Sequence, residues 1–461
     1  IIIYLDRCRS IETLDLLLKK VERGYVCLYC GYFEKRFEDK IINRCPVCGN
    51  PLIPVIDRVP EPVEDEGVWR WSKGFLEQDL SYKISLKEGS TPLLRSKSIN
   101  KKYRIKNLFF KDESRNPNNL FIDRGSAYLI SLIKNRGFRS VNIISRGDHA
   151  ISLATYARRA NLKSFAILPA DTLPYKIYRT MLVASKVKLV EDFEHALNIM
   201  RYYSKISPER IYISPADPYL MNGYQTILFE ILYELKKPPD AIILPVGDGA
   251  LMISLAILAK KLDLKTMFIG VRSKGESPLL SEIRSEKPLL KEYLDELLRQ
   301  TDHEIIEVSD EMILESIREM SREEALPIDP VNASVIAALH SEHVEGLDDV
   351  IVLFTGGGLL HDPAVMKIVL KEEKTDKIGL GFVKEKILEI LLEEGGAPVY
   401  RVWRILETTY GVKISLRTVY NHIKDLVNKG LIEPVLSDEE TPGRPRRIYM
   451  VTDKIFYYLM R

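Results

Sequence analysis

Residues 107–127 read NLFFKDESRNPNNLFIDRGSA, and this stretch decides the fold class. NLFFKD is an apolar run of strand length, and a polar Asn-Pro turn follows it. Further runs of the same kind follow, separated by segments of helix length. Strands that alternate with helices predict an α/β fold with parallel sheet. The runs are SVNIIS at 140–145, SFAILP at 164–169, VKLVED at 187–192, AIILPV at 241–246, MFIGV at 267–271 and VIVLFT at 350–355.

The overall composition is that of a globular protein without a dominant charge. The chain has 461 residues, of which 46% are hydrophobic and 29% charged, and its formal net charge is +2. This balance excludes bulk attraction to polyanions, so a nucleic-acid contact would need a local basic patch. We find no apolar run long enough to span a bilayer and no signal-peptide pattern, which predicts a cytoplasmic protein without a membrane partner.

Three compositional blocks predict three domains. A segment that contains the cysteines spans residues 1–57, and the alternating strand and helix pattern spans 58–372. After a charged stretch, a block with a different pattern spans residues 378–461. A chain of this length is long enough for two to four domains, each with its own core.

Four of the five cysteines form two C-x-x-C pairs. CLYC and CPVC are separated by fourteen residues, and a glycine follows each pair. A C-x-x-C turn directs both sulfurs to one point, so two such turns predict a tetrahedral thiolate site for structural Zn²⁺. Two disulfides are the alternative, which an intracellular compartment disfavours. The predicted ligands are Cys27, Cys30, Cys45 and Cys48.

Several motifs of the middle block together resemble the threonine synthase family of fold-type II pyridoxal phosphate enzymes. EGSTPLLRS begins at Glu88, NPNNLFIDRGSA at Asn116 and SRGDHAISLA at Ser145. NGYQTILFEIL, ILPVGDGALMI and LFTGGGLLHDP follow in the order of the family. An N-terminal zinc ribbon also occurs in that family. The resemblance implies a fold-type II domain with a site built for pyridoxal phosphate.

The resemblance singles out Ile122. The family reads approximately N-P-T-G-S-F-K-D-R-G over the stretch that matches residues 116–127, and its lysine forms the Schiff base with the cofactor. Isoleucine has no amine, so it can neither hold the aldehyde nor carry protons. Three alternatives remain: an engineered substitution, a shifted alignment with Lys111 as the anchor, and a cofactor held without a covalent link.

Two further segments depart from the pattern of the family. Asp148 stands where an asparagine normally meets the ring hydroxyl of the cofactor, and like charges repel. The phosphate loop, typically G-N-G-G-N, reads GDGAL here, so a carboxylate lies near the phosphate. We therefore expect a pseudoenzyme domain that holds no pyridoxal phosphate. The degenerate site consists of Asp148, Gly247, Asp248, Gly249 and Thr355, the last of which still matches the residue that meets the pyridine nitrogen.

Two interpretations of the polar residues near Asp148 remain open. Arg146, Asp148 and His149 either contact a new small-molecule ligand or fill the former cavity with a salt bridge.

The last block has the order helix, helix, helix and hairpin. Apolar positions at helical spacing predict helices over 383–394, from Pro398 to about Tyr410, and from Ser415 to Lys429. LIEPVL and RRIYMVT are strand-like runs joined by the polar loop SDEETPG, and DKIFYYLMR is expected to form a last helix. This order resembles the PadR-like winged helix-turn-helix family, and GRPRRIYMVT matches the end of its wing.

The third of these helices is the predicted recognition helix. Between residues 413 and 430 there are four basic side chains and one acidic side chain, and the wing tip adds three arginines. An acidic SDEE run precedes the wing tip, and winged helices also serve as protein-docking modules. The predicted DNA contacts are Lys413, Ser415, Arg417, Thr418, Asn421, His422, Lys424, Arg444, Arg446 and Arg447.

The sequence therefore favours a DNA-binding protein that is not an enzyme. We expect a transcriptional regulator or chromatin-associated factor of the nucleoid that binds double-stranded DNA as a homodimer. Its central domain would serve dimerisation or the sensing of a small-molecule effector. One alternative is a pyridoxal phosphate lyase that acts on a phosphorylated or hydroxylated amino acid and carries a DNA-binding domain. The other is an adaptor whose zinc ribbon and winged helix both dock on proteins.

Overall fold

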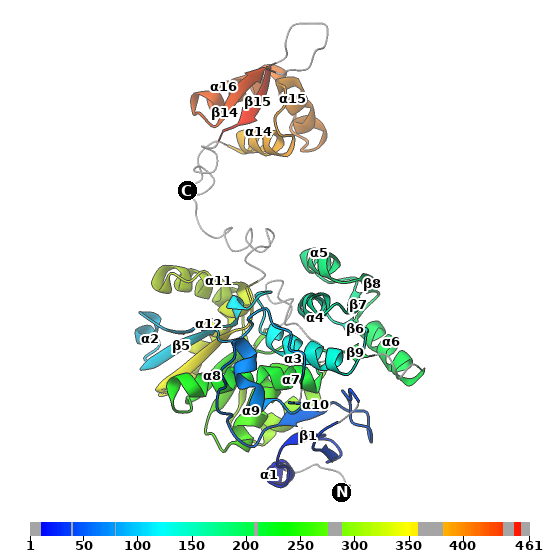
Figure 1. Ribbon diagram of the computed structural model, residues 1–461. Coiled ribbons are helices and arrows are strands. Elements are labelled where there is room, and N and C mark those ends of the chain that lie inside the picture. Colours follow the sequence, from blue (N-terminus) through cyan, green and yellow to red (C-terminus); the bar gives the residue numbers. More distant parts are fainter. Residues whose placement is uncertain are drawn as a thin grey trace. The chain divides into compact units, whose positions relative to one another are not determined.

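The chain divides into two compact units, Ile1–Met366 and Lys367–Arg461. The first unit is an α/β structure with two mainly parallel sheets, and the second combines helices with a two-stranded sheet (Figure 1). Within the described ranges, no helix has both the length and the apolar character that a bilayer crossing requires. The computed structural model describes residues 11–37, 40–78, 80–206, 211–274, 288–357, 381–436 and 447–452.

The larger sheet of the first unit has six strands in the order β12-β11-β10-β13-β5-β4. Neighbouring strands pair in parallel, except that β4 is antiparallel to β5. Every residue of β10 and β13 is buried, as expected for strands covered on both faces. The strands are β4 Leu93–Arg95, β5 Asn107–Asp112, β10 Ala241–Pro245, β11 Met267–Ser273, β12 Glu304–Val308 and β13 Asp349–Phe354.

The smaller sheet is parallel throughout, in the order β8-β7-β6-β9. Each of the seven apolar runs named in the sequence contributes a strand to one of these two sheets, so the predicted α/β fold with parallel sheet is confirmed. The strands are β6 Ser140–Ile144, β7 Lys163–Pro169, β8 Lys186–Val190 and β9 Tyr212–Ile213.

Helices pack around the two sheets and share one large core. Helix α3 is buried from Ile122 to Ile133 and crosses α7 at a pair of glycines. A side-chain carbon at Gly125 would lie 2.6 Å from the carbonyl oxygen of Leu220, so only glycine permits this approach. The helices are α2 Ile99–Lys102, α3 Ile122–Asn135, α4 Asp148–Arg159, α5 Pro174–Val183, α6 Phe193–Ile206, α7 Pro218–Tyr224, α8 Thr226–Leu235, α9 Ala250–Lys261, α10 Lys291–Arg299, α11 Asp310–Glu319 and α12 Pro330–Ala337.

The N-terminal segment contributes to the same core. Helix α1 (Ile11–Lys20) precedes an antiparallel sheet in the order β2-β1-β3. The ring of Tyr25 stacks on Phe37 at 5.2 Å and meets the ring of Tyr219 in α7 edge-on at 5.3 Å. The predicted zinc ribbon is thereby attached to the α/β core by aromatic packing. The strands are β1 Gly24–Val26, β2 Phe33–Glu34 and β3 Ile53–Val55.

The described residues of the second unit form three helices and a pair of antiparallel strands, in the predicted order. Ser415 caps the third helix, as expected, because its hydroxyl accepts a hydrogen bond of 3.1 Å from the Thr418 N–H. The strands pair antiparallel from Ile432 opposite Val451 to Leu436 opposite Arg447. The expected last helix in DKIFYYLMR lies outside the described residues. The elements are α14 Phe382–Glu393, α15 Val399–Thr408, α16 Leu416–Asn428, β14 Ile432–Leu436 and β15 Arg447–Val451.

Candidate functional site

A pocket in the first unit lies where several parallel strands end. The loops after β6, β10 and β13 line it, together with the first residues of α3, α4 and α9. The carboxyl ends of parallel strands are the usual place for a ligand in an α/β sheet. The structure brings all the residues of the predicted degenerate site into this one pocket: Ile122, Asp148, Gly247, Asp248, Gly249 and Thr355.

The glycine turn after β10 forms one wall of the pocket. Gly249 adopts a left-handed backbone with φ +88° and immediately precedes α9, which begins at Ala250. The first N–H groups of a helix have no partner within the helix, and the helix dipole makes this end positive. The wall therefore has the geometry that binds a phosphate or another anion.

Asp248 was expected to oppose a phosphate at this turn. Its carboxylate accepts a hydrogen bond of 3.4 Å from the Leu289 N–H, and its carbonyl accepts one of 3.2 Å from the Leu290 N–H. The negative charge is thus stabilised by the segment that precedes α10. Asp248 is therefore not a bare carboxylate at the glycine turn, and its presence is a weaker argument against an anionic cofactor.

Asp148 is paired as well. Its Oδ2 accepts a hydrogen bond of 2.8 Å from the Nζ of Lys176 in α5. Lys176 is only 2% exposed and lines the same pocket. A neighbouring cation removes most of the repulsion that an isolated carboxylate would impose on a phenolate-like oxygen. The salt bridge that the sequence left open is present, but its cation is Lys176 rather than Arg146.

Sequence reasoning missed Lys176. In α5 the buried residues are Lys176 and Thr180, one helical turn apart, while Tyr178, Met181 and Leu182 are largely exposed. The helix therefore turns polar residues inward and apolar residues outward, the reverse of the usual pattern. The spacing of Lys176 and Thr180 could have indicated a polar face directed inward, but the apolar residues between and after them suggested an inward apolar face instead.

Ile122 lies at the first position of α3 and is 2% exposed. The Phe121 N–H donates to the Thr355 carbonyl at 3.0 Å, and Leu120 bridges to Gly356. These bonds hold the start of α3 against the end of β13. Lys111, the alternative anchor, does not line the pocket: its Nζ contacts the carboxylates of Glu230 and Glu234. The shifted alignment therefore has no support in the structure.

Two further polar residues border the pocket. The Nε2 of His149 lies 3.2 Å from the Tyr224 hydroxyl, and burial lowers the pKa of His149 to about 4, so this ring is neutral at pH 7. The guanidinium of Arg146 lies over the ring of Phe193 at 4.5 Å, and its Nε is buried without a hydrogen-bond partner among the described residues. Arg146 thus has a donor available for a ligand.

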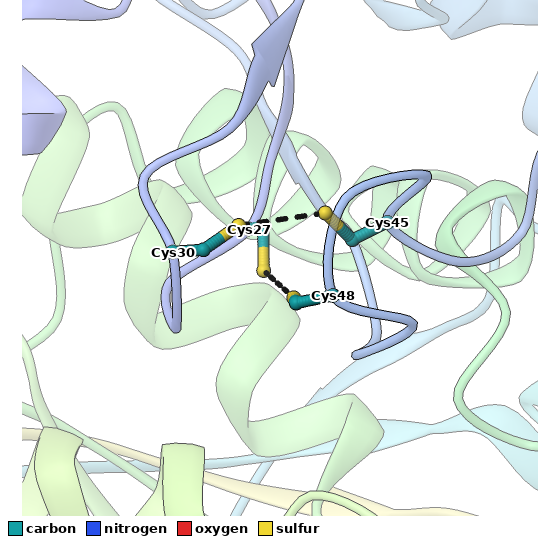
Figure 2. Close-up of side chains that lie close together, drawn as sticks. All are labelled: Cys27, Cys30, Cys45 and Cys48. Atoms are coloured by element: carbon teal, nitrogen blue, oxygen red, sulfur yellow. Dashed lines mark hydrogen bonds between the residues drawn. The ribbon is translucent and has the colours of Figure 1, made fainter. Parts of the chain in front are cut away.

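The four predicted metal ligands converge on one point near the N-terminus (Figure 2). All four sulfurs lie within 4.8 Å of one another, and the Cys27–Cys48 and Cys30–Cys45 pairs are 3.5 Å apart. A disulfide requires about 2.05 Å, whereas sulfurs around a tetrahedral ion lie roughly 3.8 Å apart. The thiols are free, so the disulfide alternative is wrong.

The predicted DNA contacts divide between described and undescribed residues. Lys413, Arg417 and Lys424 are exposed at or near α16, and Arg447 is exposed at the start of β15. The one acidic residue of this helix, Asp425, pairs with Lys429 at 3.1 Å and with Lys384 of α14. Arg444 and Arg446 lie outside the described residues. The remaining predicted contacts are Ser415 and Asn421, which are exposed, and Thr418 and His422, which are half-buried.

Comparison with known proteins decides the family. Residues 84–356 match the family described as pyridoxal-phosphate dependent enzyme, which is more than half of the chain. The chain belongs to this family.

The similarity to individual relatives covers more of this chain than residues 84–356. The threonine synthase of Methanosarcina acetivorans is 27% identical over 403 residues, which cover 78% of this chain and 98% of that protein. The threonine synthase of Methanocaldococcus jannaschii is 28% identical over 381 residues, which cover 73% and 92%.

Solved structures of the family share the fold. The processed form of threonine deaminase isoform 2 from Solanum lycopersicum has a TM-score of 0.52 at 20% identity and covers 68% of this chain and 97% of that chain. Maize serine racemase has a TM-score of 0.51 at 19% identity and covers 61% and 91%. The α/β fold-type II architecture expected from the sequence is therefore confirmed.

These findings correct the functional expectation. The expected DNA-binding regulator without enzymatic activity is wrong, because the family and the relatives are those of an enzyme. The description as a pseudoenzyme has no support either, and the expectation that pyridoxal phosphate is not bound conflicts with the family. The physical reason is that Asp148 and Asp248 stand as unpaired charges in the sequence, whereas both have partners in the structure.

Proposed function

We propose that this chain is a pyridoxal phosphate-dependent lyase that acts on a phosphorylated or hydroxylated amino acid and carries a winged helix at its C-terminus. One observation carries the proposal: a single pocket combines an anion-binding glycine turn, Thr355 and a buried lysine amine. The names of the relatives, threonine synthase, support an amino acid as substrate.

The pocket residues fit the cofactor. The turn at Gly247–Gly249 and the first N–H groups of α9 would hold the phosphate, and Thr355 would face the pyridine nitrogen. When bound, the cofactor supplies an electron sink that stabilises negative charge on the α carbon of an amino acid. Phe121 and Tyr224, whose rings contact each other at 4.8 Å, line the pocket and would limit the access of water to the cofactor.

The substrate would be anchored by charge. Arg146 has a buried Nε without a partner among the described residues, and its guanidinium is planar and always protonated. Such a group binds a carboxylate or phosphate in bidentate fashion. Arg146 therefore suits the carboxylate of an amino acid or the phosphate of its side chain.

Cofactor binding by the full chain tests the proposal. Equilibrium dialysis against pyridoxal phosphate should give saturable binding of one equivalent. Gly249→Val should weaken it, because a β-branched residue is strained at φ +88°. Gly346→Val is the matched control, since Gly346 has φ +80° but lies in an exposed turn away from the pocket.

Activity gives the second readout. Phosphate release from O-phosphorylated amino acids and ammonia release from serine and threonine would be measured with the loaded protein. We expect turnover of at least one of these substrates. Absence of cofactor retention, or cofactor retention without any turnover, would contradict the lyase.

We also propose that the cysteine cluster holds a structural Zn²⁺. Four thiolates fill all positions of a tetrahedral ion, so no position remains for a substrate. The Cys27 sulfur lies 3.5 Å from the Tyr293 hydroxyl, which connects the cluster to α10. Elemental analysis should find about one zinc per chain, and Cys45→Ser should lower that content.

The second unit is proposed to be a winged helix-turn-helix that binds DNA as an accessory to the enzyme. The exposed side of α16 carries Arg417 and Lys424, and its other side buries Val419, Ile423 and Leu426. Fluorescence anisotropy of duplex DNA with the full chain should show weaker binding for Arg417→Ala than for Arg404→Ala on the exposed side of α15. Equal affinities would favour protein docking instead.

A further inference from the structure

By the resemblance to the threonine synthase family, Ile122 stands where that family has its Schiff-base lysine, which raises the question of which amine the cofactor could meet. Among the described residues that line the pocket, one is a lysine, and it is Lys176. Arg146 is the other basic residue there with a permanent charge, but a guanidinium does not deprotonate in proteins and is no nucleophile. A covalent link to an aldehyde needs a primary amine.

The backbone gives Lys176 a path into the pocket. Gly147 has φ +126°, and a side-chain carbon at this position would lie 2.6 Å from the Cδ of Lys176 and 2.9 Å from its Cβ. The methylene chain of the lysine therefore passes directly over Gly147. Since Lys176 is 2% exposed, this path carries its amine to the pocket and away from bulk solvent.

Asp148 positions the amine at the end of this path. The Nζ of Lys176 donates to the Asp148 Oδ2 at 2.8 Å, and Asp148 is the first residue of α4, where the helix dipole stabilises a carboxylate. An ammonium must lose a proton before it attacks a carbonyl carbon. A carboxylate in hydrogen-bond contact can take up that proton and later face the positive product.

We propose that Lys176 forms the imine with the aldehyde of pyridoxal phosphate, with Asp148 as its counter-ion. This inference rests on the proposed function. The Nζ bonds to the aldehyde carbon, and the aldehyde oxygen leaves as water with two of the three ammonium hydrogens. The product is a protonated imine that keeps the single positive charge, so no oxidant or reductant is needed.

This assignment explains together two departures from the family pattern, Ile122 and Asp148, which have no evident connection in the sequence. Ile122 removes an amine from the start of α3, and Asp148 introduces a carboxylate at the start of α4. A carboxylate is unfavourable beside a phenolate-like oxygen but favourable beside a cation. Asp148 therefore belongs with Lys176, and the pair replaces the function of the missing lysine.

Reductive trapping on the full chain tests the assignment. The chain is incubated with pyridoxal phosphate, reduced with sodium borohydride, digested and mapped by mass spectrometry. We expect one phosphopyridoxyl group on the peptide that contains Lys176, and a visible absorption band before reduction. In Lys176→Arg the label and the band should disappear, because arginine keeps the charge next to Asp148 but cannot form an imine.

Two controls keep the outcome interpretable. Lys186→Arg changes an exposed lysine ten residues away and should keep the label. Equilibrium dialysis of Lys176→Arg should still detect cofactor held without a covalent bond, which also shows that the pocket is folded.

Each alternative outcome identifies what has failed. A label on another lysine that persists in Lys176→Arg overturns the assignment and leaves the lyase intact. Cofactor retained by dialysis without any label also overturns the assignment alone. Cofactor that is not retained by the unsubstituted chain overturns both the assignment and the proposed function.

Discussion

Lys111 and Lys176 are both almost fully buried in the first unit, but of the two only Lys176 lines the pocket. The Nζ of Lys111 donates to the Thr91 carbonyl at 2.7 Å and contacts Glu230 at 2.8 Å and Glu234 at 3.1 Å. Each ammonium hydrogen thus has a partner. The Nζ of Lys176 contacts the Asp148 carboxylate at 2.8 Å and lies at the surface of a pocket.

The surroundings of Lys111 form a closed ionic network. The Arg124 guanidinium contacts Glu113 at 2.6 Å and Glu230 at 2.7 Å, and further bonds reach Thr91 and Thr226. Burial would raise the pKa of Glu230, but the cations Arg124 and Lys111 lower it to about 2. Among the described residues, the buried polar atoms of Lys111, Arg124 and Glu230 all have protein partners, and none of these three residues lines the pocket.

The difference separates structural from functional buried charge. A buried ion pair is tolerated when its remaining hydrogen-bonding capacity is filled, and breaking it leaves an uncompensated charge. The Lys111 network meets that condition with residues from β5, α3 and α8. The Lys176–Asp148 pair borders a pocket, where a ligand can contact it. Burial alone would not have distinguished the two lysines.

The largest expected effect is on the network. Lys111→Met should lower the free energy of unfolding by about 3–5 kcal/mol, because the Glu230 carboxylate would lose one of its two cations in a buried site. Denaturant unfolding monitored by circular dichroism measures this loss. A change in the free energy of unfolding below about 1 kcal/mol would show that the Glu230 carboxylate does not depend on Lys111 for its charge compensation.

Lys176→Met should cost less, about 1–2 kcal/mol. The Asp148 side chain is 27% exposed, so water in the pocket can solvate the carboxylate once its partner is removed. The same unfolding assay, run beside Lys111→Met, compares the two lysines directly. Equal losses for both substitutions would remove the distinction between a closed network and an open pair.

Acid should affect the pocket before the network. Burial lowers the pKa of His149 to about 4; the charge of Asp148 raises this pKa and the charge of Lys176 lowers it. An unfolded histidine binds a proton near pH 6.5. The stability that neutral His149 contributes is present above pH 6.5 and is lost as the pH falls toward 4. Glu230, with its pKa lowered to about 2, loses its contribution only below about pH 4.3.

The measurement is the free energy of unfolding between pH 7 and pH 4. Between pH 7 and about pH 5.5, one unit below the unfolded pKa, His149→Gln should flatten the profile by roughly 1 kcal/mol, since only the unfolded histidine takes up a proton there and one pKa unit corresponds to about 1.4 kcal/mol. His343→Gln is the control, because His343 is exposed. A profile of His149→Gln that matches the unsubstituted chain would show that another group titrates in this range.

The smallest effect is expected at the surface. Lys106 lies 3.5 Å from Asp348, with both side chains more than half exposed. Lys106→Met should change the free energy of unfolding by at most about 0.5 kcal/mol, because solvent screens exposed ion pairs. The unfolding assay for Lys111→Met applies here too. A loss comparable to that of Lys111→Met would mean that burial does not set the size of these effects.

Local patterns predicted much of the fold and part of the site. The two C-x-x-C turns predicted a convergent thiol cluster because each turn fixes its own sulfurs and only their meeting depends on the fold. The strand runs were evident because buried parallel strands are continuously apolar. Ile122, Asp248 and Thr355 were assigned to one site because the resemblance to the threonine synthase family matches each of them with a motif that meets the cofactor, and the structure brings them into one pocket.

Long-range contacts defined what the sequence could not. Lys176 reaches Asp148 from another helix, and the N–H partner of Asp248 comes from residue 289. Neither contact follows from spacing, so in the sequence both carboxylates stand as bare charges. That appearance, together with the attention given to Ile122, produced the wrong expectation of a protein without enzymatic activity.

The three residues that follow Ile122 at the start of α3 are each fixed by contacts of their own. Asp123 accepts hydrogen bonds from Asn118 and from the Ser152 hydroxyl, Arg124 is the centre of the ionic network, and Gly125 permits the crossing with α7. Each of these three residues has a structural task that does not involve residue 122. The D-R-G triplet therefore reports the architecture of this helix start and not the chemistry of the side chain that precedes it.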